Sequence, residues 1–306
     1  MGAPLQTTLD RAAVLPGIVG GERLRFFRDG IDGPSWAEQL ALPTPILPDL
    51  HLGVPTTLTV ETITGSLTVG LLLAHDAGAR TPVLVAHHGN SERPFELDGR
   101  AKNFLNRALL RGGPPPDATV LLLRAAYHDG PLRDYTAAAG DIARWMSILA
   151  ASVAATRAVV VRYGDALERP ILLTGFSLGG WVANLHRAFD GRADRYVPML
   201  AGAHLASQFL DSSYRHMTSR IARDAPQRLR ALLDFDVPFR AASAEVAPLL
   251  AQHDRYARAA QQADDYRGWP VTWLDTGHLG AALAGDQLRG HVLRQLASLA
   301  GPGRGS

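Results

Sequence analysis

The sequence predicts an α/β fold, in which a mostly parallel sheet carries an antiparallel N-terminal hairpin and helices on both faces. Three observations support this class. Residues 57–73 alternate in polarity on either side of a turn, as the strands of a β-hairpin do. Further along, short apolar runs are typical of strands that are buried on both faces of a parallel sheet. Amphipathic segments with helical spacing separate these runs, and this alternation indicates an α/β protein.

The predicted core covers residues 56–202 and 246–300, and a turn at 64–66 joins the two hairpin strands. Strands are expected at 57–63, 67–73, 82–87, 119–123, 170–174, 195–200, 246–251 and 271–274. Helices are expected at 101–109, 142–153, 178–189 and 288–299. Pro198 counts against one of these strands, because proline has no N–H group to donate to a sheet.

Two segments lie outside this core. Residues 1–55 are predicted to form an N-terminal arm, because Pro43, Pro45 and Pro48 favour extended backbone over the surface. Residues 203–245 form an insertion that is too long and too apolar for a loop, so we expect a small helical cap there. Two roles are open for this cap: a lid that covers the substrate, or extra helices packed at the sheet edge.

The predicted cap is rich in arginine: Arg215, Arg220, Arg223, Arg228 and Arg230. These side chains either attract an anionic acyl or alcohol group, or form a solvated helix face. The solvated face is favoured, since most charge runs in proteins are solvated.

Size and composition are those of a soluble globular protein. The 306 residues are compatible with one large α/β domain or with such a domain plus a cap. The chain has no cysteine, which excludes thiol nucleophiles, disulfides and cysteine-based zinc sites. The formal net charge is +2 and the basic residues are scattered, so nucleic acid is not an expected partner.

No targeting or membrane-spanning segment is evident. Residues 1–21 lack a basic stretch followed by a long apolar core, and Asp10 and Arg11 interrupt them. No apolar run reaches the roughly 18 residues that a membrane span needs. We therefore expect a cytoplasmic protein, and whether it forms a homo-oligomer is left open.

A glycine-rich turn follows the apolar strand at 170–174. Its sequence, Gly175-Phe176-Ser177-Leu178-Gly179, has the form G-x-S-x-G and stands directly before an amphipathic helix. A serine on so sharp a strand-to-helix turn projects from the end of the strand on a strained backbone. Glycines two residues before and after it supply the clearance that the bend requires. The motif is short, so its context decides its meaning.

Three further pieces follow the chain order of a known superfamily. His88-Gly89 forms a turn after an early strand, Asp254 follows a late strand, and Gly277-His278 follows the last strand. With the motif around Ser177, they make the chain similar to the α/β-hydrolase superfamily of serine hydrolases, and above all to its esterase-like and lipase-like members. The resemblance covers residues 56–299, and the order Ser, Asp, His is that of this superfamily.

The resemblance implies a Ser-His-Asp triad. Ser177 is the expected nucleophile, which needs a base to remove its proton, and His278 is the expected base because its glycine-flanked loop can reach the serine. His88 is expected to brace its own loop. The remaining histidines are expected at surface or packing positions, apart from His87, which is considered below as a metal ligand: His51, His75, His128, His186, His204, His216, His253 and His291.

Asp254 is the expected third member, a buried carboxylate that holds the imidazole in the required tautomer. The sequence departs from the family here, since Ala251 stands where family members often have glycine. Asp275 is the main rival, although it lies close to the histidine in sequence and is poorly placed to orient it. Weaker rivals are Glu245, Asp264 and Asp265.

The resemblance also implies an oxyanion hole made of two backbone N–H groups. One belongs to Leu178, and the other comes from the loop after the early strand, where Asn90 is the expected donor and Ser91 and Gly89 are alternatives. No metal or other cofactor is expected, because His87, His88 and His75 have no carboxylate partner in a metal-binding pattern.

The expected activity is hydrolysis of carboxylic esters of a small-molecule acyl substrate, through an acyl-enzyme on Ser177. A peptidase, a thioesterase or an acyltransferase would use the same triad. A binding protein of the same fold without catalysis is the alternative from another class, and fold analogy does not identify a substrate.

Overall fold

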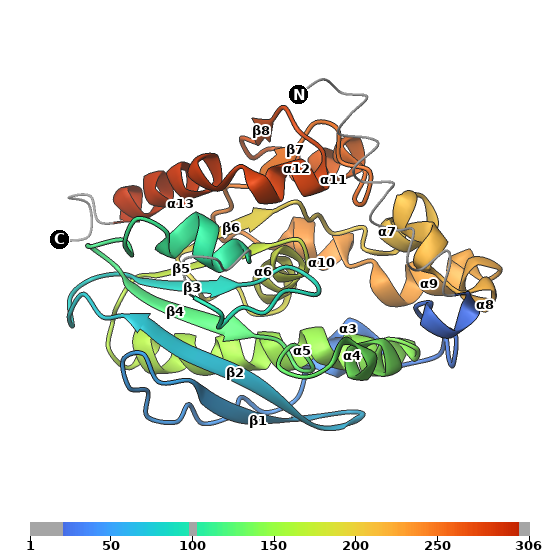
Figure 1. The fold of residues 1–306 in the computed structure, drawn as a ribbon, viewed down its shortest axis with the longest axis horizontal. Helices are drawn as coiled ribbons and strands as arrows, with labels where there is room; N and C mark the ends of the chain where they lie inside the picture. Colours follow the sequence, from blue (N-terminus) through green and yellow to red (C-terminus); the bar gives the residue numbers. More distant parts are fainter. Residues whose placement is uncertain (1–20, 98–102, 300–306) are drawn as a thin grey trace.

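The structure is a computed structural model that describes residues 21–97 and 103–299. The expectations for residues 1–20, for Ala101 and for residue 300 lie outside the described residues. Eight strands form one sheet in the order β1-β2-β4-β3-β5-β6-β7-β8 (Figure 1). The pairs β1–β2 and β2–β4 are antiparallel and all others are parallel, so the predicted class is confirmed.

The strands are close to their expected positions: β1 Thr56–Thr62, β2 Gly65–His75, β3 Val83–His87, β4 Thr119–Arg124, β5 Ile171–Phe176, β6 Arg195–Met199, β7 Leu249–Ala251 and β8 Thr272–Leu274. The hairpin turn lies at residues 63–64, earlier than predicted, because Gly65 already pairs with Thr62. Pro198 is accommodated inside β6. Hydrogen bonds from the N–H groups of Tyr196 and Leu200 to the carbonyls of residues 245 and 249 flank the proline, which has no N–H group of its own to donate.

The helices of the core and of the N-terminal segment are η1 Glu22–Leu24, α3 Trp36–Leu40, η2 Asn106–Leu110, α4 Leu132–Ala138, α5 Ile142–Val159, η3 Val160–Asp165, α6 Leu178–Phe189, α11 Ala259–Asp265, α12 His278–Leu283 and α13 Gly285–Leu299. The expected helix at 101–109 is observed as a short helical segment with a π-helical turn, η2. The bounds of α6 agree with the prediction at both ends.

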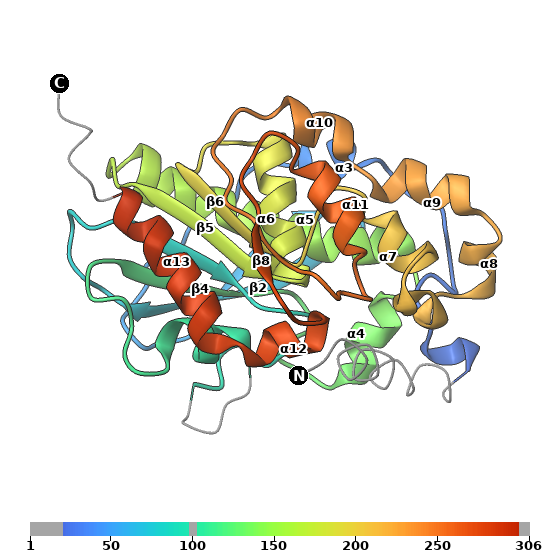
Figure 2. The same ribbon diagram turned by 90° about the horizontal axis from the view of Figure 1, so that it is seen from above.

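Helices cover both faces of the sheet. Val83 and Val85 of β3 belong to one buried cluster, and Leu84 and Ala86 belong to the other, as the alternation of side chains in a strand requires. The first cluster includes residues of α5 and α6, and the second includes residues of η2 and α13 (Figures 1 and 2). The carboxyl ends of the parallel strands therefore open between two helical layers, where such sheets place their sites.

One described helical stretch, Ile142–Asp165, is long and apolar enough to cross a membrane. Its apolar window is 89% buried inside the protein, and its α5 portion packs against β1, β2 and α6. The core helix of a globular protein has the same properties.

The insertion between β6 and β7 is helical, and α7, α8 and α9 lie together at one end of the molecule (Figure 2). Its elements are α7 Ala206–Leu210, η4 Ser213–Met217, α8 Arg220–Arg223, α9 Pro226–Leu233 and α10 Asp236–Ala241. We refer to residues 203–245 as the cap.

The described part of the N-terminal arm is more ordered than an extended surface segment. Phe26 and Phe27 are buried, and the N–H of Phe26 donates to Met217 of the cap at 2.8 Å. Farther on, the indole of Trp36 donates to the carbonyl of Leu233 at 2.9 Å. A capping box at Ser35 begins α3. The segment thus packs between the cap and the core, which the prolines did not indicate.

Candidate active site

Ser177 occupies a strained turn between β5 and α6. Its backbone is in the positive-φ region, at φ 52° and ψ −108°, which a non-glycine residue adopts only where the surroundings hold it. The Ser177 N–H donates to the carbonyl of Met199 at 2.8 Å. A Cβ atom on Gly175 would collide with the backbone of Gly179, and one on Gly179 would collide with the carbonyl of His87. The two glycines therefore permit the turn.

His278 contacts both other members of the expected triad. It is buried at the start of α12, and its Nε2 lies 3.0 Å from the Oγ of Ser177. Its Nδ1 lies 2.8 Å from an oxygen of Asp254. This geometry fits a neutral imidazole whose Nδ1–H donates to the carboxylate and whose Nε2 accepts the serine proton.

Asp254 is held by the turn that follows β7. Its other carboxylate oxygen accepts the N–H groups of Tyr256 at 2.7 Å and Ala257 at 2.9 Å. The side chain is fully buried. Ala251 is compatible with this turn, since its carbonyl accepts the N–H of Asp254 at 3.2 Å. Hydrogen bonds to both oxygens fix the carboxylate toward His278.

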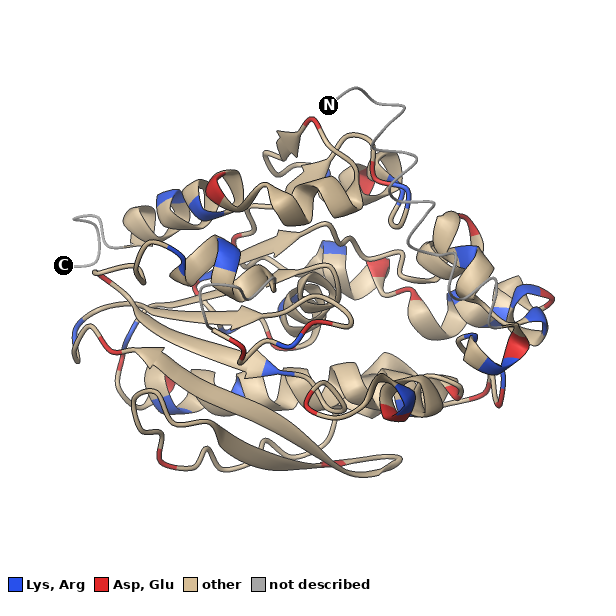
Figure 3. Cartoon of the chain, in the orientation of Figure 1, with Lys and Arg blue, Asp and Glu red and all other residues tan. Residues whose placement is uncertain are grey.

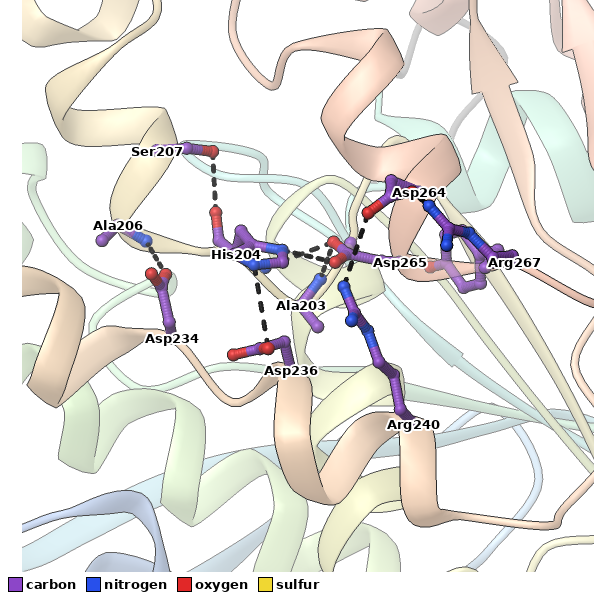
Figure 4. A network of polar contacts seen from close by, with 12 residues as sticks. Ala203, His204, Ala206, Ser207, Asp234, Asp236, Arg240, Asp264, Asp265 and Arg267 are labelled. Carbon is purple, nitrogen blue, oxygen red and sulfur yellow. Dashed lines mark hydrogen bonds and ion pairs between the residues drawn. The ribbon is translucent and has the colours of Figure 1, made fainter.

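The rival carboxylates lie elsewhere. The side chain of Asp275 is 81% exposed and accepts a hydrogen bond from His253 at 2.9 Å. Each of the others contacts a basic group outside the site: Asp264 with Arg267, Asp265 with His204, and Glu245 with Arg195. Figure 4 shows Asp264 and Asp265 in the network around His204, at the base of the cap.

A half-buried glutamate that the sequence did not indicate, Glu92, holds the loop after β3. Glu92 accepts the N–H of Gly89 at 2.7 Å with one oxygen and the N–H of Phe104 at 2.8 Å with the other. Burial raises the pKa of this carboxyl group, while the two hydrogen bonds oppose the rise. Ser91 in the same loop has φ 60°. Glu92 thus ties the backbone just before Asn90 to the start of the helical segment at Phe104.

His88 braces the loop, as expected for it. Its Nδ1–H donates to the carbonyl of Gly89 at 2.6 Å, and its Nε2 accepts the N–H of Ala125 at 3.0 Å. Burial lowers the pKa of His88 well below the ordinary value, so the ring is neutral. The carbonyl of His88 accepts the N–H of Gly179 at 3.0 Å, which ties the loop to the turn at Ser177.

Asn90 and Leu178, the two expected oxyanion donors, line one small pocket together with Ser177. The pocket is partly open to solvent, and six aromatic side chains form most of its wall: Phe26, Tyr135, Trp145, Trp181, Phe209 and Tyr214. The Asn90 amide donates to the hydroxyl of Tyr214 at 3.0 Å. Tyr214 belongs to η4 of the cap, so a cap residue contacts the loop that carries Asn90.

Most of the cap arginines are engaged in the exposed pairs expected of a solvated face. Three of the five form ion pairs: Arg220 with Asp224, Arg228 with Asp32, and Arg230 with Asp211. In Figure 3, basic and acidic residues alternate at the end of the molecule formed by α8 and α9. None of the five lines the pocket beside Ser177.

No group of three or more His, Asp or Glu side chains within residues 21–97 and 103–299 is arranged to hold a metal ion. His87, which the sequence analysis considers together with His88 and His75 as a metal ligand, donates from Nε2 to the hydroxyl of Thr156 at 2.8 Å. Burial lowers the pKa of His87 to about 3, so its ring is neutral.

No protein-family model matches the sequence, and no curated protein matches it. Solved structures are similar in fold. An acylaminoacyl peptidase of Pyrococcus horikoshii has a TM-score of 0.51 at 14% identity over 79% of this chain. The chain spans only 40% of that peptidase.

Two esterase structures are comparable. One from Pyrobaculum calidifontis has a TM-score of 0.49 at 13% identity over 98% of this chain and 94% of its own. Est1E from Butyrivibrio proteoclasticus has a TM-score of 0.49 at 13% identity over 79% and 99%. At these identities, the similarity to the peptidase establishes the fold, and the activity has to be argued from the site.

Proposed function

We propose that this chain, which has the α/β-hydrolase fold, is a serine hydrolase that cleaves carboxylic esters through an acyl-enzyme on Ser177. One observation carries the proposal: a continuous hydrogen-bonded chain joins Ser177, His278 and Asp254, at 3.0 Å and 2.8 Å. The three residues come from three separate loops at one end of the sheet. A chain of nucleophile, base and orienting acid is the arrangement that activates a serine hydroxyl.

Acylation begins when Nε2 of His278 takes the serine proton while Oγ attacks the ester carbonyl. Negative charge then develops on the carbonyl oxygen, and the N–H groups of Leu178 and Asn90 stabilise it. A single donor of this kind contributes about 10²–10³ in rate. The tetrahedral intermediate collapses, the C–O bond to the alcohol breaks, and His278 protonates the leaving alcohol.

Deacylation repeats these steps with water. His278 removes a proton from the water, the hydroxide attacks the acyl carbonyl, and the carboxylic acid leaves as Oγ regains its proton. Throughout, Asp254 keeps Nδ1 of His278 protonated and stabilises the imidazolium that forms. The backbone donors of Tyr256 and Ala257 keep that carboxylate in place.

The proposal is tested by the turnover of short-chain aryl esters. Ser177→Ala should lower kcat by a factor on the order of 10⁴ or more, because the remaining groups cannot replace the nucleophile. Circular dichroism establishes that the variant is folded. Turnover of the same esters at the wild-type rate by folded Ser177→Ala would overturn the mechanism.

A further inference from the structure

A second pocket continues the one beside Ser177. It is partly open to solvent, and both pockets are lined by Phe26, Asn90, Tyr135 and Tyr214. The four shared residues place the two pockets next to each other, and Ser177 lines the inner one. We refer to the two adjoining pockets together as the channel. The outer part lies between the N-terminal segment, α4 and η4, which contribute Leu24, Leu132 and Met217.

The channel is mostly apolar, but its outer part contains a guanidinium group. Arg25 lines the second pocket, and its side chain is 19% exposed. Within the described residues, its Nε atom is buried and has no hydrogen-bond partner. Its Nη1 pairs with Glu22, three residues earlier, whose side chain is 53% exposed. Such a pair between neighbouring residues at the surface contributes little, so another anion can compete for the guanidinium.

The position of His278 decides which part of an ester occupies the channel. His278 must lie beside the leaving oxygen in order to protonate it. It lines neither pocket, whereas Leu178 and Asn90, the proposed oxyanion donors, line the inner one. The alcohol therefore departs on the side of His278, away from the channel, and the acyl arm extends past Tyr214 toward Arg25.

We propose that the preferred acyl group of this enzyme is an apolar arm that ends in a carboxylate, and that Arg25 binds this carboxylate. The inference rests on the proposed function and names its substrate class. A purely alkyl arm would cover the guanidinium without pairing it, which is unfavourable, whereas a carboxylate would use its unpartnered Nε–H. Hydrolysis of such a half-ester releases the alcohol and a dicarboxylic acid, with water as the only co-reactant.

The test compares 4-nitrophenyl hydrogen adipate with 4-nitrophenyl hexanoate, which differ in the terminal carboxylate. The wild type should have a KM about tenfold lower for the adipate, the usual size of one charge-assisted contact. Arg25→Gln should bring the ratio of the two KM values close to one. Arg23→Gln is the matched control, since Arg23 is exposed on η1 and lines neither pocket, and it should keep the wild-type ratio.

Glu22→Gln should change the KM for the adipate in the direction opposite to Arg25→Gln. Removing the competing carboxylate should lower the KM for the adipate further and leave the hexanoate value unchanged. A KM for the adipate that is equal to or higher than that for the hexanoate, or a ratio that persists in Arg25→Gln, would overturn the inference.

A binding measurement separates this inference from the proposed function. Calorimetry on Ser177→Ala compares monomethyl adipate with methyl hexanoate, and no chemistry is required. Tighter binding of the adipate that depends on Arg25 supports the inference even if no ester is hydrolysed. Equal binding overturns it even if Ser177 proves to be the nucleophile.

Discussion

The hydroxyl of Tyr214 accepts a hydrogen bond from the side-chain amide of Asn90 at 3.0 Å, across 124 residues of sequence. Tyr214 lies in the cap, and Asn90 lies in the loop that we propose to supply an oxyanion donor. The cap and this loop are therefore coupled directly. A change in the cap can alter the chemical step as well as substrate access.

Tyr214→Phe tests this coupling. The substitution keeps the ring, whose centroid lies 5.5 Å from that of Phe26 and 5.8 Å from that of Phe209. It removes the hydroxyl that accepts the hydrogen bond of the Asn90 amide. Losing one hydrogen bond worth about 1 kcal/mol should lower kcat roughly fivefold and leave KM nearly unchanged. Steady-state kinetics measures both constants. Tyr163→Phe serves as a control, because Tyr163 packs under Arg169 and lines neither pocket. A fall confined to KM would contradict the coupling.

Glu92→Gln should impair catalysis more than stability. A glutamine has a single carbonyl oxygen, so it can accept only one of the two N–H groups that Glu92 now binds, and its own NH₂ group faces the other. We expect kcat to fall by about tenfold or more, because the loop that carries Asn90 is displaced. Kinetics and thermal unfolding, measured together, check this. Wild-type kcat in a folded variant would show that the loop does not depend on Glu92.

Gly179→Ala should abolish activity and destabilise the fold. The added Cβ would lie 2.5 Å from the carbonyl oxygen of His87, so the turn or β3 must move. Gly290→Ala is the matched control. Gly290 lies within α13, where a Cβ meets only the end of the flexible Arg294 side chain, and alanine there should stabilise the helix by about 1 kcal/mol. Chemical denaturation distinguishes the two variants, and similar stabilities for both would contradict the account of the turn.

The base of the cap should lose stability as the pH rises. The hydrogen bond from His204 to Asp265 raises the pKa of His204 against the effect of burial (Figure 4). Its stabilising effect is complete below about pH 6.5 and is lost as the pH passes the raised folded value. Burial raises the pKa of Asp234 to about 6, so its ionisation weakens the fold between about pH 4 and 6.

The His204 contribution is measured by comparing His204→Gln with the wild type. Asp265, Asp234 and Asp236 are the acidic groups around His204, and all of them remain in the variant. The difference in unfolding free energy should be largest below about pH 6.5 and should shrink at higher pH. His216→Gln, at an exposed position, should show no such trend. A difference in unfolding free energy that grows with rising pH would contradict the predicted direction of the pH dependence.

Local patterns were sufficient to predict the sheet and the turn at Ser177. The bounds of α6 follow from its amphipathic pattern and the stop signal at Gly191. Asp254 and His278 are implied by the resemblance to the α/β-hydrolase superfamily, which has an acid and a histidine after its late strands. Closeness to His278 in sequence disfavours the main rival, Asp275, without excluding it, and in the structure Asp275 contacts His253.

Contacts between distant segments could not be predicted in this way. Glu92 looks like any loop carboxylate until its two backbone donors are known. Phe26 lies in a segment without periodicity, yet it lines both pockets. Tyr214 and Arg25 gain their places in the channel only when the cap and the N-terminal segment pack together. Such positions depend on tertiary packing, which leaves no periodic trace in a single sequence.

The most direct test of the central claim is covalent labelling with a fluorophosphonate, followed by peptide mapping of the modified residue. Folded wild-type protein should be labelled once, on Ser177, whereas Ser177→Ala and His278→Gln should be labelled negligibly. An unlabelled wild-type protein, or a label on another residue that persists in Ser177→Ala, would contradict the claim.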